Sequence, residues 1–164
     1  MIELKVAEIR VAGTETPPVV VLAEVDGAQR LLPIWMTHGG AAAILGATED
    51  PDQRRPSIHD LTSAILGELR NNELLAVEII GCDEGQFYAE LVFAHRRMPA
   101  RPSDAIAVAL RLGRPIRATA EVMDACAVAA EVAEDDAPRD EAEVERFLEF
   151  LDTVTPEDFG GEKP

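Results

Sequence analysis

The sequence has few of the features that mark membrane or secreted proteins. Its apolar runs, such as Val19–Ala23, fall far below the ~20 residues that a membrane-spanning helix needs, so we expect no membrane association. It has two cysteines, Cys82 and Cys126, without the spacing of metal ligands, and no basic and apolar leader at its N-terminus. We therefore expect a cytoplasmic protein with reduced thiols, since a disulfide between the two is disfavoured in that compartment.

Positive charge is also scarce, with 15 Lys and Arg against 31 Asp and Glu and a formal net charge of -16. A polyanion must be met by basic side chains, so this charge argues against general nucleic-acid binding. The charge is uneven, however, because residues 131–164 hold 13 acids and three bases. Six arginines lie within the 22 residues from Arg96 to Arg117, where Asp104 is the sole acid. A local phosphate site is therefore not excluded.

The 164 residues, 47% hydrophobic and 28% charged, suit one globular domain. Alternation and β-branched runs predict strands at residues 2–11, 19–25, 30–36, 74–80, 87–93 and 115–119, with hairpin signals at Asp26-Gly27 and Asp83-Glu84-Gly85. Apolar spacing predicts helices at residues 38–48, 57–70 and 103–112 and a helical turn at 121–126, and a short polar connection at 95–100. The pattern predicts an α+β fold.

The chain divides by composition into a domain (1–126), an acidic linker (127–140) and a C-terminal amphipathic helix with a tail (141–164). The apolar face of that helix consists of Val144, Phe147, Leu148 and Leu151. Two interpretations of this extension stay open. It is either solvated, with the helix docked by its apolar face, or its acids lie on the arginine-rich segment and compete with nucleic acid.

The start of the second predicted helix carries candidate chemistry. Ser57 and Asp60 form an S-x-x-D capping box, and His59 lies in the same first turn, where backbone N–H groups favour anions. An imidazole beside a carboxylate suits metal ligation or proton transfer. The alternative is that Asp60 only caps the helix and His59 is a polar surface residue.

The start of the third predicted helix is similar, with Arg101, Ser103 and Asp104. Arg101 could hold a phosphate in bidentate fashion, and Asp104 could ligate a metal. The alternative is that Ser103 caps the helix, Asp104 complements its dipole and Arg101 pairs with a nearby acid. If the fold brings the two helix starts together, they would form a site for phosphate plus a divalent cation.

The order of the motifs resembles that of the bifunctional nuclease (DNase/RNase) domain family over roughly residues 2–126. The matching stretches are LPIW, an alanine-rich helix, RPSIHDL, GQFYAEL and ARPSDAIAVALR followed by P-I. The acidic extension is similar to that of actinobacterial members. The resemblance implies an α+β domain with a curved antiparallel sheet packed with about three helices. It also implies assembly into homodimers or higher homo-oligomers, and nuclease activity on DNA and RNA with a divalent metal, Mg²⁺ or Mn²⁺.

We therefore predict a metal-dependent phosphodiesterase acting on nucleic acid, with its site residues at the motif positions. The catalytic candidates are His59, Asp60 and Asp104, of which Asp60 and Asp104 would also hold the metal. The candidates for phosphate and nucleic-acid binding are Arg55, Arg101, Ser57 and Ser103.

The sequence departs from the family pattern at three positions. Gly40 stands where members usually carry an acid before the alanine-rich helix, Pro99 stands where they often have an aspartate, and Ile58 replaces a threonine. A second hypothesis follows from the lost acids. In it the chain is a catalytically weak or inactive member that acts as an oligomeric interaction or regulatory protein.

Overall fold

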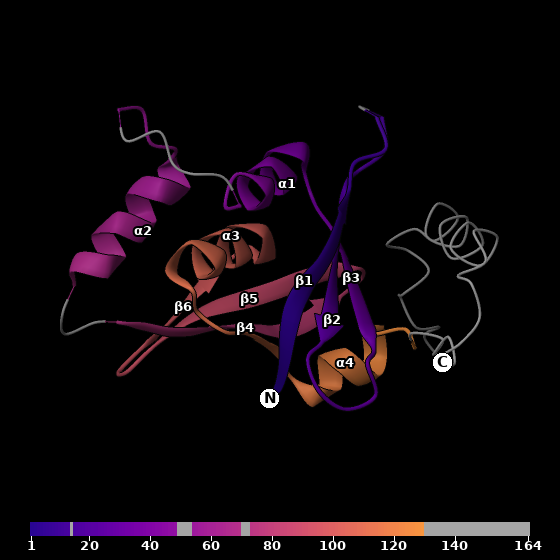
Figure 1. Cartoon of the computed structure of the whole chain (residues 1–164). Helices are drawn as coiled ribbons and strands as arrows, with labels where there is room; N and C mark the ends of the chain where they lie inside the picture. The colour runs from indigo at the N-terminus through magenta and orange to yellow at the C-terminus, as the bar shows by residue number, and fades with distance from the viewer. Residues whose placement is uncertain (14, 49–53, 70–72, 130–164) are drawn as a thin grey trace, which may run out of the picture.

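A computed structural model describes residues 1–13, 15–48, 54–69 and 73–129 (Figure 1). The predicted C-terminal helix and tail, most of the acidic linker and the end of the second predicted helix lie outside the described residues. No helix in the described part of the chain is long and apolar enough to cross a membrane. Both cysteines are free thiols.

The described strands form one open, seven-stranded sheet in the order β3-β2-β1-β7-β4-β5-β6. Its strands are β1 (Ile2–Arg10), β2 (Val19–Glu24), β3 (Leu31–Trp35), β4 (Leu74–Asp83), β5 (Gln86–Phe93), β6 (Arg97–Ala100) and β7 (Ile116–Ala118). The predicted meander and the second hairpin are both present as antiparallel pairs. The sheet is mixed, because β7 joins the two halves by running antiparallel to β1 and parallel to β4.

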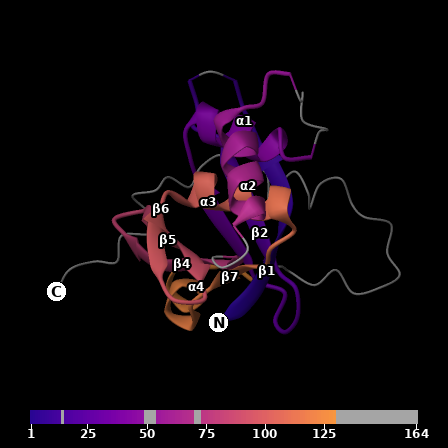
Figure 2. The same ribbon diagram turned by 90° about the vertical axis from the view of Figure 1, so that its left-hand side faces the viewer.

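Four helices accompany this sheet in the described residues: α1 (His38–Leu45), α2 (Ile58–Glu68), α3 (Pro102–Leu112) and α4 (Ala120–Cys126). Figures 1 and 2 show α1, α2 and α3 together on one side of the sheet and α4 on the other. The predicted α+β class is therefore confirmed. The core is continuous from the sheet to α3, whose residues 105–109 are all buried.

Two local predictions are wrong. Residues 97–100 form the edge strand β6 rather than a polar connection, because Met98 and Pro99 pair with β5 while their side chains stay exposed. Ser103 does not cap α3, since the helix begins one residue earlier at Pro102 with Arg101 as N-cap. Proline is favoured at the first helical position, where its missing N–H costs nothing, so Pro102 sets this start.

The apolar spacing of α2 also has an unexpected outcome. Of the large apolar side chains at helical spacing in this segment, Leu66 packs against the core, whereas Leu61, Ile65 and Leu69 are exposed. Helix α2 rests on α3, with the buried Ser63 and half-buried His59 on its inner side. The helix therefore carries an apolar face that the rest of the described domain does not cover.

Candidate functional site

The first turn of α2 is built on the predicted capping box. Ser57 is the N-cap, and its Oγ accepts a hydrogen bond from the Asp60 N–H at 3.2 Å. Asp60 Oδ2 in turn accepts from the Ser57 N–H at 2.9 Å. These reciprocal bonds satisfy two backbone donors that a helix start leaves open. The box fixes the direction of the turn that carries His59.

The first turn of α3 has no side-chain cap hydrogen bond at its N-cap, Arg101. Asp104 is therefore not engaged in a capping box and its carboxylate is available to other side chains. Ser103 is buried against α1, where a Cβ added at Gly40 would lie 2.7 Å from the Ser103 Cβ. Because such a contact is closer than side chains tolerate, glycine at position 40 allows α1 to approach α3 this closely. An acidic side chain at this position would not fit the observed packing.

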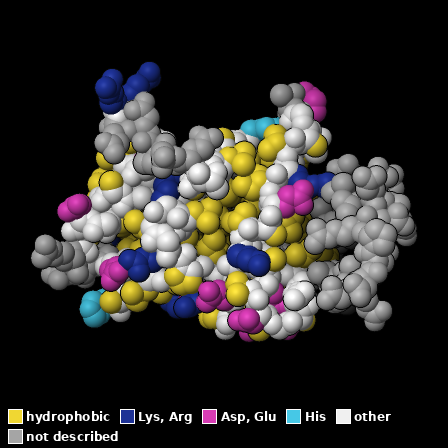
Figure 3. Space-filling view, in the orientation of Figure 1, with side chains coloured by type: hydrophobic (Ala, Val, Ile, Leu, Met, Phe, Trp, Pro, Cys, Tyr) yellow, Lys and Arg dark blue, Asp and Glu magenta, His cyan; other side chains and the backbone are white. Residues whose placement is uncertain are grey.

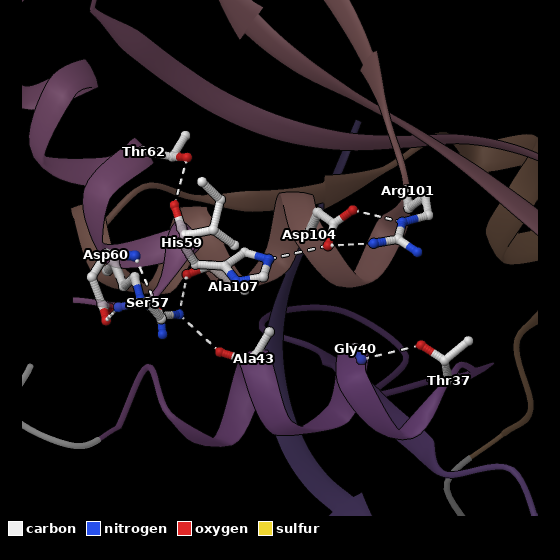
Figure 4. A network of polar contacts seen from close by, with 12 residues as sticks. Thr37, Gly40, Ala43, Ser57, His59, Asp60, Thr62, Arg101, Asp104 and Ala107 are labelled. Carbon is white, nitrogen blue, oxygen red and sulfur yellow. Dashed lines mark hydrogen bonds and ion pairs between the residues drawn. The ribbon is translucent and has the colours of Figure 1, made fainter. Parts of the chain in front are cut away.

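His59, Asp104 and Arg101 form a cluster between the two helix starts (Figure 4). His59 Nε2 lies 3.1 Å from Asp104 Oδ1. Arg101 donates to the same carboxylate from two nitrogens, at 2.7 Å to Oδ2 and 3.1 Å to Oδ1. The side chain of His59 is 18% exposed, that of Asp104 31% and that of Arg101 71%. Exposure therefore increases from the ring outward to the guanidinium, and the cluster opens to solvent at Arg101.

The charge state of Asp104 follows from its neighbours. Burial raises its carboxyl pKa, but hydrogen bonds from Arg101 and His59 together outweigh that effect and leave the pKa below its ordinary value. Asp104 is thus an ionised acceptor, and a carboxylate has no proton to donate. The contact therefore requires a proton on His59 Nε2, and in the neutral tautomer with that proton Nδ1 is the unprotonated nitrogen.

Asp60 belongs to a second network, centred on Arg111 near the end of α3. Arg111 Nε donates to Asp60 Oδ1 at 2.5 Å, and its Nη1 donates to the carbonyls of Ala43 at 2.8 Å and Ala107 at 3.0 Å. The two side chains are 10% and 16% exposed. Arg111 therefore joins α1, α2 and α3, and it lowers the pKa of the Asp60 carboxyl to about 2, with help from Ser57.

Sequence reasoning missed this role of Arg111, which it placed only in the arginine-rich segment. The partner Asp60 is 51 residues away, so no local spacing could indicate the pair. The remaining predicted phosphate ligand, Arg55, is exposed and takes no part in either described network. The fold thus brings together His59, Asp104 and Arg101, and it assigns Ser57 and Asp60 to the helix start.

The arginine-rich segment is largely neutralised by acids of the domain. Besides Arg101 and Arg111, Arg97 pairs with Glu78 and Glu90, and Arg114 pairs with Glu73. These acids lie on β4, on β5 and just before β4. Most of the positive charge that the sequence concentrates here is therefore neutralised within the domain. Among the four ion-paired arginines of this segment, Arg101 has the most exposed side chain.

Asp60 and Asp104, the predicted metal pair, offer a resident divalent cation little free coordination capacity. Both oxygens of Asp60 are engaged, by Arg111 and by the Ser57 N–H, and both oxygens of Asp104 are engaged by Arg101 and His59. Mg²⁺ and Mn²⁺ need free oxygen ligands. The described residues hold no group of three or more His, Cys, Asp or Glu side chains that could bind a metal ion.

Comparison with known proteins identifies relatives of this chain. A model of the bifunctional nuclease domain matches residues 20–131, a range that contains both helix starts. Two uncharacterized proteins, from two strains of Mycobacterium tuberculosis, are each 39% identical over 164 residues. The match covers 96% of this chain and 97% of each relative, so the similarity extends through the C-terminal extension as well.

Proposed function

Because the chain belongs to the bifunctional nuclease domain family, we propose that it hydrolyses phosphodiester bonds in DNA and RNA at the His59–Asp104–Arg101 cluster. The observation that carries this proposal is the bridge between the two helix starts, in which one carboxylate holds an imidazole on one side and an exposed guanidinium on the other. Hydrolysis of a phosphodiester needs at least a general base held in position beside a side chain that binds the phosphate.

In this proposal Arg101 binds the phosphate. Its guanidinium has five N–H donors in a planar fork, and Asp104 uses only one edge of that fork. The other donors are free to face two non-bridging oxygens of a nucleic-acid phosphate. As negative charge builds on those oxygens in the transition state, the fixed positive charge stabilises it more than it stabilises the ground state.

His59 is the proposed general base. Its Nδ1 takes a proton from a water molecule as the water oxygen attacks phosphorus, and the bond from phosphorus to the leaving sugar oxygen breaks. That oxygen then takes a proton from solvent, and the imidazolium returns its proton to water. Asp104 acts by holding the ring through Nε2 and by stabilising the imidazolium, the role that an aspartate has in a catalytic triad.

Dependence on a divalent cation, Mg²⁺ or Mn²⁺, remains a separate prediction. The steps above do not involve such a cation, because the carboxylates of Asp104 and Asp60 are paired with Arg101 and Arg111. Activity with and without EDTA, followed by titration with each cation, tests this prediction independently of the His59 assignment.

The test of the function is hydrolysis of single- and double-stranded DNA and RNA by the full chain. We expect His59→Ala to lower kcat/KM by about 100-fold or more, which is the usual contribution of a general base. His95→Ala is the matched control, because His95 is exposed in the turn between β5 and β6. Equal activity of His59→Ala and the wild type would reject this site.

The second candidate function, an oligomeric interaction or regulatory protein without catalysis, is supported by the close contact of Gly40 with Ser103. That contact leaves no room at position 40 for the acid that family members usually carry. If the folded wild type hydrolyses neither DNA nor RNA with any cation, this second function is favoured over the first.

A further inference from the structure

The two cysteines of the chain meet on the side of the sheet that α4 covers. Cys82 lies in β4, and Cys126, which follows it by 44 positions, is the last residue of α4. Both belong to one apolar cluster, in which Cys126 is only 4% exposed and the half-buried Cys82 packs against it. Neither thiol takes part in the proposed hydrolysis, so the proposed function leaves this pair unused.

Helix α4 follows β4 from a shared hydrogen bond. Strand β7 runs parallel to β4 and ends with Ala118 opposite Ile79. The next residue, Thr119, is the N-cap of α4 and donates its backbone N–H to the Ile79 carbonyl at 3.1 Å. From Ile79 to Cys82 the strand advances about 10 Å, and from Thr119 to Cys126 the helix advances about 10 Å. Since the helix packs on the strand, the two cysteines come to the same level.

The thiol of Cys126 also responds to its neighbour. Burial raises the pKa of this thiol to about 12, and the Cys82 thiol contributes to the rise. Such a contribution requires the two side chains to be neighbours, which is the first geometric condition for a disulfide. Because Cys126 is buried and protonated at neutral pH, the less buried Cys82 is the thiol that a small reagent reaches first.

Further contacts fix the end of α4 in place. Arg30, between β2 and β3, donates from Nη1 to Asp124 Oδ1 at 2.8 Å. Leu31 of β3 and Val128 exchange two backbone hydrogen bonds, both of 2.8 Å. These contacts lie two residues before and two residues after the buried thiol. That thiol is therefore held beside its partner, and groups held in one place react faster than groups that must first meet.

We propose that Cys82 and Cys126 are a redox-active pair, which small disulfides oxidise to a reversible disulfide bond that ties α4 to β4. The Cys82 thiolate attacks one sulfur of the small disulfide, forms a mixed disulfide and releases one small thiolate. Cys126 then gives its proton to solvent, and its thiolate attacks the Cys82 sulfur and releases the second small thiolate. Two protein thiols are oxidised, and one small disulfide is reduced to two thiols.

Acidic side chains around the pair decide which small disulfide approaches it. Asp83 and Glu84 follow Cys82, and Glu121 and Asp124 lie on α4, all four with exposed positions. Figure 3 shows acidic side chains along the lower edge of the molecule, where α4 lies. This negative field repels anionic disulfides and attracts cationic ones. A cationic small disulfide is therefore the probe of choice.

Treatment of the reduced full chain with cystamine, a small cationic disulfide, tests the proposal. We expect both thiols to disappear and mass spectrometry of a non-reducing digest to find the peptides of Cys82 and Cys126 joined within one chain. The midpoint of thermal unfolding should rise by about 5 °C or more, because the bond closes a long loop and restricts the unfolded chain. Dithiothreitol should reverse both changes.

Two single variants separate the steps. Cys126→Ser should stop at a mixed disulfide on Cys82, because the second thiol is missing. Cys82→Ser is the matched control for the thermal shift, and cystamine should leave its unfolding midpoint unchanged. Should Cys126→Ser fail to fold, the thiol count of the wild type and the Cys82→Ser control still decide the matter.

Three results would overturn the proposal. They are a folded wild type that keeps both thiols, a mixed disulfide that persists on its Cys82, and a bond that joins two chains instead of closing within one. An internal disulfide that leaves the unfolding midpoint unchanged would contradict the tie between α4 and β4. None of these measurements depends on nuclease activity, so failure of the proposed function leaves this test intact.

Discussion

The chain has the same tripeptide, Arg-Pro-Ser, at the starts of α2 and α3, but its residues have different structural roles in the two helices. At α2 the serine is the N-cap, and at α3 the serine is the second helical residue, buried against α1. Each helix nevertheless has an aspartate at its third position. Asp60 closes a capping box and an ion pair with Arg111, whereas Asp104 holds His59 and the exposed Arg101.

The difference teaches that the position of the cap decides what a nearby acid can do. A carboxylate that accepts a hydrogen bond from the backbone N–H of its own N-cap has less acceptor capacity left for a substrate. A helix that starts on proline, with no side-chain cap, leaves its first-turn carboxylate to organise other side chains. We therefore propose that Asp60 contributes to stability and that Asp104 contributes to the chemistry.

The largest effect on stability should come from Arg111→Ala. Arg111 donates two hydrogen bonds to the carbonyls of α1 and α3, and each is worth about 1 kcal/mol, so we expect a loss of about 2 kcal/mol in the free energy of unfolding from these bonds alone. Urea denaturation measures it.

The matched control for that variant is Arg114→Ala. Arg114 forms an ion pair with Glu73 near the surface, and such pairs contribute about 0–1 kcal/mol. If both variants lose the same stability, Arg111 does not hold the three helices together, and the contrast between the two helix starts weakens.

A smaller effect is expected at the cap itself. Ser57→Ala removes the acceptor for the Asp60 N–H and should cost about 1 kcal/mol. Ser57→Asn retains an acceptor at the N-cap and should cost only a few tenths of that. Thermal unfolding of the two variants separates capping from other effects of the substitution, and equal losses would argue that the capping box contributes nothing.

A pH dependence follows from the same ion pair. Arg111 and Ser57 lower the carboxyl pKa of Asp60 from 3.8 to about 2 on folding. The resulting stabilisation is complete above pH 3.8 and is lost as the pH falls toward 2. The stability difference between the wild type and Asp60→Asn should therefore shrink over that interval, as measured by urea denaturation at each pH. A difference that is constant with pH would show that the pair does not form.

Features with local causes were predictable from the sequence. The S-x-x-D pattern indicated the capping box. The third helix ends at residue 112 as predicted, followed by Gly113 in a left-handed conformation with φ of 59°. Alternation and turn residues indicated the meander and the hairpin. Each of these depends on residues within a few positions of one another.

Features that depend on distant residues were not predictable. The Asp60–Arg111 pair joins positions 51 apart, and the His59–Asp104 contact joins positions 45 apart. The sequence could name the candidates His59, Asp60, Asp104 and Arg101, but it could not divide them between two networks. It also could not indicate that the apolar line of α2 faces outward, because spacing identifies a helix face without saying what covers it.

The most direct test of the account compares kcat/KM for DNA and RNA between Asp104→Asn and Asp60→Asn at 25 °C, where both should be folded. Asparagine keeps the size of the side chain and removes its charge. We predict that Asp104→Asn lowers kcat/KM by about 100-fold or more, because the imidazole loses its orienting carboxylate, while Asp60→Asn stays within about threefold of the wild type. Equal losses in the two variants, or a larger loss in Asp60→Asn, would contradict the assignment of chemistry to Asp104 and of stability to Asp60.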